Sequence, residues 1–266
     1  MKICSISNQK GGVGKTTSSV NIATYLGKMG YKTLLIDLDP QGNASSGIGL
    51  NKYRIDKSIY HALIGEIDLV DIVRKSDYEN LFVVPSNRDL IGAEVELMQA
   101  YSRETKLLSA LNSVQNDFDF CFIDCPPSLN LLTVNALTAS DYILIPVQTE
   151  YYALEGISEL LNTVQLVREN LNKNLSILGI VLTMFDSRNN LANQVVDEVR
   201  SYFKDKVFSS IIPRNVKLSE SPSHGEPILV YDSKSRGAEA YEKLSEEIVA
   251  RLNGVSKGNL RLVNDV

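Results

Sequence analysis

The sequence has few cysteines, no long apolar run and no excess of positive charge, and each absence excludes a class of protein. Its 266 residues include three cysteines without CxxC spacing. An odd number of this kind is typical of free thiols in a reducing compartment rather than of a disulfide scaffold. No apolar run is long enough to cross a membrane, and no signal-peptide pattern precedes the first strand-like segment. We therefore expect a cytoplasmic protein.

The charge and the distribution of turn residues limit the function and the domain organisation. A net charge of −5 argues against indiscriminate coating of nucleic acid, although it leaves room for a local basic surface. Pro, Gly and Ser are scattered rather than gathered into a linker, and there is no internal repeat. We expect one domain over residues 1–252, large enough for a sizeable core, followed by a polar tail over residues 253–266.

Short apolar runs alternate with segments of helical spacing along the chain. The runs are nearly continuous, as in strands buried on both faces, and cover 3–6, 33–36, 82–84, 120–123, 142–147 and 177–182. The helical segments cover 16–29, 91–114, 129–138, 154–169, 191–203 and 238–252. This alternation predicts an α/β fold with a doubly wound, mostly parallel sheet, helices on both faces and a ligand at the carboxyl ends of the strands.

A glycine-rich loop between the first strand and the first helix is the most informative segment. Glycines at positions 11, 12 and 14 permit backbone angles and close approach that a Cβ would block, so N–H groups can point at phosphate oxygens. Lys15 would reach the β- and γ-phosphates, and the Thr16 hydroxyl would bind Mg²⁺. The predicted nucleotide-binding residues of this loop are Lys10, Gly11, Gly12, Val13, Gly14, Lys15, Thr16 and Thr17.

The loop departs from the usual phosphate-loop pattern at two positions. Gln9 stands where the first glycine is expected, and Lys10 stands where no lysine is required. The segment resembles the deviant Walker A form of the ParA/MinD family of dimerising ATPases, which have the P-loop NTPase-like fold. In that family the additional lysine reaches the nucleotide of the partner subunit. The resemblance implies catalytic roles for Lys10 and Lys15, with ATP and Mg²⁺ as cofactors.

Carboxylates follow two of the expected strands. Asp37 and Asp39 stand at the exit of one strand, before the turn residues Pro40 and Gly42, and Asp124 ends another strand as a Walker B aspartate. By resemblance, Asp39 orients the attacking water, while Asp37 supports the magnesium water shell and Asp124 holds magnesium through water. The alternative for the first pair is a strand that ends in a solvated acidic turn.

The second half of the chain extends the resemblance to ParA proteins of the Soj type, in the segments 151–156, 182–188 and 212–225. These proteins imply that Met184, Pro213 and Asn215 lie around the adenine. They also single out four basic residues as DNA contacts, namely Arg188, Lys217, Lys234 and Arg236. His224 is expected to be a structural loop residue, because phosphoryl transfer here needs no imidazole base.

The family resemblance implies a slow ATP hydrolase that partitions a chromosome or plasmid. An ATP-bound sandwich homodimer would bind double-stranded DNA without sequence preference on the nucleoid, and a centromere-binding ParB-like partner would stimulate hydrolysis and release.

Three rival functions stay open from the residues. A MinD-like membrane ATPase is disfavoured because the tail from Asn253 to Gly258 breaks helical periodicity, so no stable membrane association is expected. An iron–sulfur reductase component would need two cysteines near an interface, where only Cys125 is a candidate. A repressor subtype would need an N-terminal helix-turn-helix, whereas the first expected strand begins at Ile3.

Overall fold

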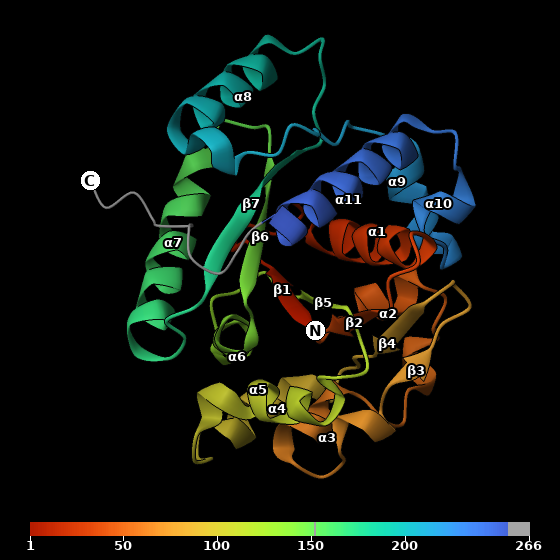
Figure 1. The fold of residues 1–266 in the computed structure, drawn as a ribbon, viewed down its shortest axis with the longest axis vertical. Helices are drawn as coiled ribbons and strands as arrows, with labels where there is room; N and C mark the ends of the chain where they lie inside the picture. Colours follow the sequence, from red (N-terminus) through yellow and green to blue (C-terminus); the bar gives the residue numbers. More distant parts are fainter. Residues whose placement is uncertain (152, 255–266) are drawn as a thin grey trace.

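The computed structural model describes residues 1–151 and 153–254, which form a seven-stranded sheet with helices on both faces (Figure 1). The strand order is β3-β4-β2-β5-β1-β6-β7; β3 is antiparallel to β4, and the other neighbours pair in parallel. The strands are β1 Lys2–Ile6, β2 Thr33–Asp37, β3 Arg74–Lys75, β4 Leu81–Val84, β5 Phe120–Asp124, β6 Tyr142–Gln148 and β7 Ser176–Thr183. The predicted fold class is confirmed.

Helices of eight or more residues cover the sheet and follow the strands in sequence. They are α1 Lys15–Lys28, α4 Leu90–Leu97, α6 Leu131–Ala139, α7 Ala153–Asn170, α8 Asn190–Phe203 and α11 Arg236–Gly254. Shorter helices are α2 Asn43–Gly47, α3 Ile59–Ile64, α5 Lys106–Leu111, α9 Val216–Glu220 and α10 Ile228–Tyr231. Single 3₁₀ turns are η1 Lys52–Arg54, η2 Leu69–Asp71, η3 Arg103–Thr105, η4 Asn112–Val114, η5 Lys204–Lys206 and η6 Ser221–His224.

Three apolar clusters bury the faces of the sheet. Helices α1, α10 and α11 pack on one face, around Tyr25 and Tyr241, whereas α3, α4, α5 and α6 pack on the other face (Figure 1). Helices α7 and α8 cover β6 and β7 through Leu160 and Val199. Since every central strand is buried on both sides, its near-continuous apolar run is explained.

The structure corrects two predicted segments. The single helix expected over 91–114 is divided into α4, η3, α5 and η4, because the chain turns at Ser102, whose φ of 52° is left-handed and cannot continue a helix. The last helix, expected over 238–252, is longer at both ends, because α11 covers Arg236–Gly254; residues 255–266 of the expected tail lie outside the described residues. The short helices α2, α3, α9 and α10 and the two-residue strand β3 were not predicted.

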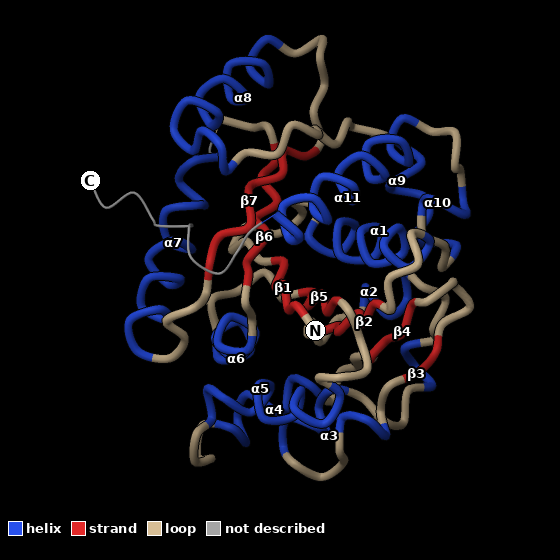
Figure 2. The backbone as a smooth tube through the Cα atoms, viewed as in Figure 1, coloured by secondary structure: helices blue, strands red, loops and turns tan. Residues whose placement is uncertain are grey.

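The sheet topology predicts a ligand-binding position at the carboxyl ends of β1 and β5. Strand β1 lies between β5 and β6, as the strands drawn in Figure 2 show. The helix after β1 leads to β2 on one side, whereas the helix after β5 leads to β6 on the other side and packs on the opposite face. Where two connections diverge in this way, a ligand can bind between the loop after β1 and the loop after β5.

Candidate functional site

The loop between β1 and α1 has the backbone geometry of a phosphate cradle. Gly12 and Gly14 adopt φ values of 75° and 89°, where a residue with a Cβ would be strained. Gly11 differs from the prediction, because its φ is not positive and an added Cβ would come no closer than 3.9 Å to Pro127. The side chain of Val13 is buried, and its carbonyl accepts a hydrogen bond of 2.9 Å from the Thr183 hydroxyl. The loop is therefore anchored to the end of β7.

The two lysines of the loop point in different directions. Lys15 is only 6% exposed, and its ammonium donates to the carbonyl of Lys10 at 3.1 Å. Burial lowers the pKa of Lys15 against the opposing effect of Asp124. The ammonium of Lys10 instead leaves the loop and forms a 3.0 Å ion pair with Glu150, its side chain remaining 38% exposed. The sequence analysis missed Asn8, whose side chain accepts from the Lys10 N–H and donates to the carbonyl of Pro146.

The Walker B carboxylate lies beside the start of α1. Asp124 accepts hydrogen bonds of 2.8 Å from the hydroxyls of Thr16 and Ser19. Burial, followed by the charge of Asp37, raises the pKa of Asp124. Ser19 was not predicted, although its position three residues after Thr16 places both hydroxyls on one helix face. Hydroxyl and carboxylate oxygens beside a phosphate cradle are the donors that Mg²⁺ prefers, so the residues fit the predicted metal.

The two aspartates after β2 have different surroundings. Asp37 is fully buried and accepts from the N–H and hydroxyl of Ser45, both at 2.7 Å, and from the N–H of Asp39. Burial raises its pKa to about 6. Asp39 lies beyond the strand, 8% exposed, and one of its oxygens accepts from the Gln41 N–H. Asp37 is thus engaged by its own chain, which leaves Asp39 as the carboxylate nearer the surface.

A cavity of about 510 Å³ contains the three residues predicted around the adenine. Met184, with a left-handed φ of 54°, lies next to the chain segment of Pro213 and Asn215, and all three line the cavity with Gly14 of the loop. Asn215 also caps α9 by accepting from the Lys217 N–H at 2.8 Å. Thr17 of the predicted loop also lines this cavity, and the lining residues that were not among the predicted site residues are Thr183, Ile212, Arg214, Val216, Leu218, Ser219, Pro222 and Tyr241.

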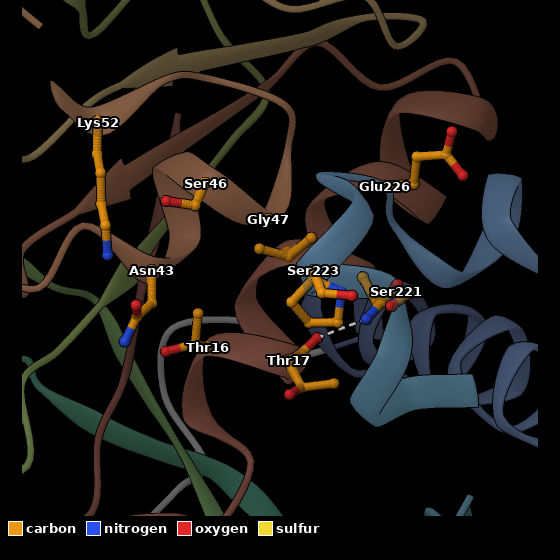
Figure 3. A pocket seen from close by; sticks show the side chains of 12 residues that line it. Thr16, Thr17, Asn43, Ser46, Gly47, Lys52, Ser221, Ser223 and Glu226 are labelled. Atoms are coloured by element: carbon orange, nitrogen blue, oxygen red, sulfur yellow. Dashed lines mark hydrogen bonds between the residues drawn. The ribbon is translucent and has the colours of Figure 1, made fainter. Parts of the chain in front are cut away.

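A second cavity of about 400 Å³ adjoins the first, since Thr17 and Pro222 line both (Figure 3). Figure 3 shows Thr16 and Thr17 at the start of α1, Asn43 and Ser46 on α2, and Ser221 and Ser223 on the segment that follows α9. Lys52 and Glu226 stand on opposite sides of this space. The segment after Asp39 and the segment after α9 therefore meet beside the phosphate loop.

The four predicted DNA contacts come from two neighbouring regions. Arg188 lies between β7 and α8, and the N–H of Arg214 donates to the carbonyl of Phe185 at 2.9 Å, which joins this segment to the one before α9. Lys217 lies on α9, whereas Lys234 lies just before α11 and Arg236 is the first residue of that helix. An added Cβ at Gly237 would come within 2.7 Å of Leu218, so α9 and α11 are in close contact. The imidazole of His224 packs on the Tyr231 ring at 5.0 Å and is exposed.

The cysteines are buried free thiols. Cys4, Cys121 and Cys125 are at most 2% exposed, and burial raises the pKa of each thiol. Cys125, the candidate for an interface thiol, is therefore inside the protein. Within residues 1–151 and 153–254, no group of three or more His, Cys, Asp or Glu side chains could hold a metal ion, and no helix is long and apolar enough to span a membrane.

Comparisons with known proteins agree with this geometry. A family model described as an AAA domain matches residues 1–177. The sporulation initiation inhibitor protein Soj of Bacillus subtilis is 55% identical over 94% of this chain and 98% of its own length. The chromosome partitioning protein ParA of Myxococcus xanthus is 52% identical, over 94% of this chain and 88% of its own length.

Two solved structures have the same fold. Cobyrinic acid a,c-diamide synthase from Mycobacterium smegmatis, solved with an ATP analog and magnesium, gives a TM-score of 0.85 at 32% identity, covering 98% of this chain and 100% of that one. The cell division ATPase MinD of Pyrococcus furiosus gives a TM-score of 0.77 at 28% sequence identity, covering 94% of this chain and 98% of that one.

The phosphate loop at the end of β1, the Walker B aspartate on β5 and the additional lysine together define a P-loop ATPase of the deviant Walker A class. Within that class, the chain belongs to the Soj/ParA family of chromosome-partitioning ATPases.

Proposed function

We propose that this protein partitions DNA as an ATP-bound homodimer, in which Lys10 of each subunit reaches the nucleotide of the other. The separation of the two lysines carries the proposal. Lys15 is buried in its own loop, whereas the Lys10 ammonium points away from that loop, where its one ion-pair partner among the described residues is the exposed Glu150. Exposed pairs of this kind are weak, so Lys10 can turn to a partner at little cost.

Catalysis in this proposal is positioning combined with electrostatic stabilisation. Lys15 and the N–H groups of the glycine loop contact the β- and γ-phosphates, and Asp39 orients the attacking water. Thr16 and Asp124 would hold Mg²⁺, which neutralises charge on the phosphates when bound. Hydrolysis removes the γ-phosphate that Lys10 contacts across the interface, so the dimer loses part of its stabilisation and dissociates.

The proposed cargo interaction is binding to double-stranded DNA without sequence preference. Its predicted contacts, Arg188, Lys217, Lys234 and Arg236, lie on loops and near helix ends. Such residues bind phosphates rather than bases. Two copies of this surface in a dimer would make affinity depend on ATP. Because relatives are named for chromosome partitioning, we place the protein in the cytoplasm on the nucleoid, with a ParB-like partner stimulating hydrolysis.

Substitution of Lys10 tests the dimer. Lys10→Ala should bind ATP as a monomer yet fail to dimerise, as measured by light scattering with ATP. Lys28→Ala is a matched control, because Lys28 forms a similarly exposed 3.1 Å ion pair with Glu242 on another surface. The control should dimerise normally, and both variants should melt within about 1 °C of wild type since exposed pairs contribute little. ATP-dependent dimers of Lys10→Ala would refute the role of Lys10 in the partner site.

A double substitution tests the DNA surface. Arg188→Ala with Lys217→Ala should still dimerise with ATP but lose binding to random-sequence duplex. Each contact removed should lower the salt slope by about one. The matched control is Arg74→Ala with Lys28→Ala. Arg74 pairs with an aspartate and Lys28 with a glutamate on the exposed surface, as Arg188 and Lys217 do. Equal binding of the first double variant and wild type across a salt titration would contradict the assignment.

The MinD-like alternative is less well supported by the comparisons. The Soj relative is 55% identical, whereas the MinD structure is 28% identical. The sequence argument against that alternative used the segment from Asn253 to Gly258, and the part of this segment after Gly254 lies outside the described residues. Flotation with anionic lipid vesicles distinguishes the two functions, since ATP-dependent recruitment to vesicles in place of DNA would support the membrane role.

A further inference from the structure

Two of the predicted DNA contacts are already occupied by carboxylates of their own chain. The Arg188 guanidinium donates to both oxygens of Asp186, at 2.9 and 2.7 Å, and this interaction lowers the pKa of Asp186 to about 2. The Lys217 ammonium lies 3.0 Å from a carboxylate oxygen of Glu220. By contrast, neither Lys234 nor Arg236 has an ion pair with another residue of the described chain.

The pair on α9 is held in place by an aromatic side chain. The Tyr231 hydroxyl donates to the same Glu220 oxygen at 3.0 Å, and its ring lies under the Lys217 ammonium, 5.5 Å from centroid to nitrogen. Hydrogen bonds from Lys217 and Tyr231 lower the pKa of Glu220. Glu220 therefore stays ionised at neutral pH and accepts from an N–H of the same Lys217 ammonium that would donate to a phosphate.

A carboxylate and a phosphodiester compete for the same cation because both present singly charged oxygen acceptors. We propose that Asp186 and Glu220 are built-in competitors of the DNA backbone, which weaken each basic surface so that only a dimer with two surfaces binds firmly. This inference rests on the proposed DNA-binding function. A DNA phosphate must displace each carboxylate from its cation and then lie near the released negative charge.

The competition lowers the affinity for DNA without abolishing binding. The Arg188 side chain is 87% exposed, and the side chains of Lys217 and Glu220 are 46% and 42% exposed, so the internal pairs are weak. Removing one of them should strengthen DNA binding about two- to five-fold. Removing both should strengthen it by the product of the two factors, because the pairs share no partner.

Neutral isosteres test this idea without removing the cations. Asp186→Asn keeps the oxygen that accepts from the Arg188 N–H at 3.1 Å, and Glu220→Gln keeps the acceptor for Tyr231. Asp56→Asn is the matched control, since it removes one negative charge and one exposed ion pair, the pair with Arg74, at a residue far in sequence from all four predicted DNA contacts. Affinity for a short random-sequence duplex is measured with ATP and without nucleotide, over a series of salt concentrations.

The expected result is two- to five-fold tighter binding for each isostere, detectable binding of the double variant without nucleotide, and a smaller change for the control. Glu220→Gln should lose its effect when Lys217 is alanine, because Glu220 acts through that lysine. The inference is overturned if Glu220→Gln tightens DNA binding equally in the Lys217→Ala background. It is also overturned if the control variant tightens binding as much as the isosteres do, or if the isosteres bind DNA more weakly than wild type. If wild type with ATP binds no duplex, the DNA-binding proposal itself fails.

Discussion

Ser18 and Ser19 are adjacent serines of α1, both completely buried, whose hydroxyls have partners of different charge. The Ser19 hydroxyl donates to the carboxylate of Asp124 at 2.8 Å and also lies 3.0 Å from the carbonyl of Lys15, whereas Ser18 shares a 3.1 Å hydrogen bond with the Tyr241 hydroxyl. Hydrogen bonds to charged groups contribute about 1.5–3 kcal/mol, and neutral ones about 1 kcal/mol. Ser19→Ala should therefore be more destabilising than Ser18→Ala, provided that Asp124 is ionised.

The loss of stability caused by Ser19→Ala should depend on pH, and the sign of this dependence can be derived. The pKa of Asp124 is raised from 3.8 to about 8, mainly by burial, so the folded protein holds this group protonated at pH 6.5 and ionised at pH 9. Because the folded state binds the extra proton, the contribution of Asp124 to stability falls as the pH rises from about 4 to 8. Ser19 offsets part of this loss at the upper end. Ser19→Ala should thus cost more at pH 9 than at pH 6.5, whereas the cost of Ser18→Ala should be the same.

Thermal unfolding without nucleotide and with a chelator measures both costs. In a protein of this size, 1 kcal/mol corresponds to about 2–4 °C in melting temperature. Ser19→Ala should melt about 4–8 °C below wild type at pH 9, and Ser18→Ala about 3 °C below it at both pH values. Equal, pH-independent losses for the two variants would show that the Asp124 carboxylate gains nothing from Ser19, and the description of the Walker B site would be wrong.

Two further substitutions separate nucleotide binding from hydrolysis. Lys15→Ala should weaken ATP binding about 10- to 100-fold, because a charge-assisted contact to the phosphates is lost, and dimerisation and DNA binding should fail with it; near-normal affinity in a titration with labelled ATP would remove Lys15 from the site. Asp39→Ala should bind ATP but hydrolyse it at least about 100-fold more slowly, so that size-exclusion chromatography shows a persistent dimer. An unchanged turnover rate would contradict the role of Asp39.

The phosphate loop and the strands could be predicted from the sequence because their signals are local. The spacing of glycines and lysines defines the loop, and buried parallel strands are continuous apolar runs that end where Asp37 and Asp124 stand. The sequence also indicated Met184, Pro213 and Asn215 through family resemblance, and the structure brings these residues to one cavity.

The parts that could not be predicted depend on contacts between distant segments. In the sequence, Ser19 has no feature that distinguishes it from an ordinary helix residue. Its partner Asp124 is 105 positions further along the chain and comes into contact with it only in the folded sheet. The second cavity joins Asn43 and Lys52 to Ser221 and Glu226 through tertiary packing. The pairing of Lys217 with Glu220 over the Tyr231 ring likewise requires α9 and α10 to be in place.

The central position of β1 has a consequence for synthesis on the ribosome. Strand β1 emerges before its partners β5 and β6, whose residues 120–124 and 142–148 are made more than 100 residues later. Pairing between strands so distant in sequence is slow, and the unpaired edges are exposed to aggregation in the meantime. The Lys2 ammonium, which donates to the carbonyl of Leu252 at 2.6 Å, finds its partner only when the last helix is complete. A nascent chain should therefore gain the ability to bind nucleotide late, after most of its length has left the exit tunnel.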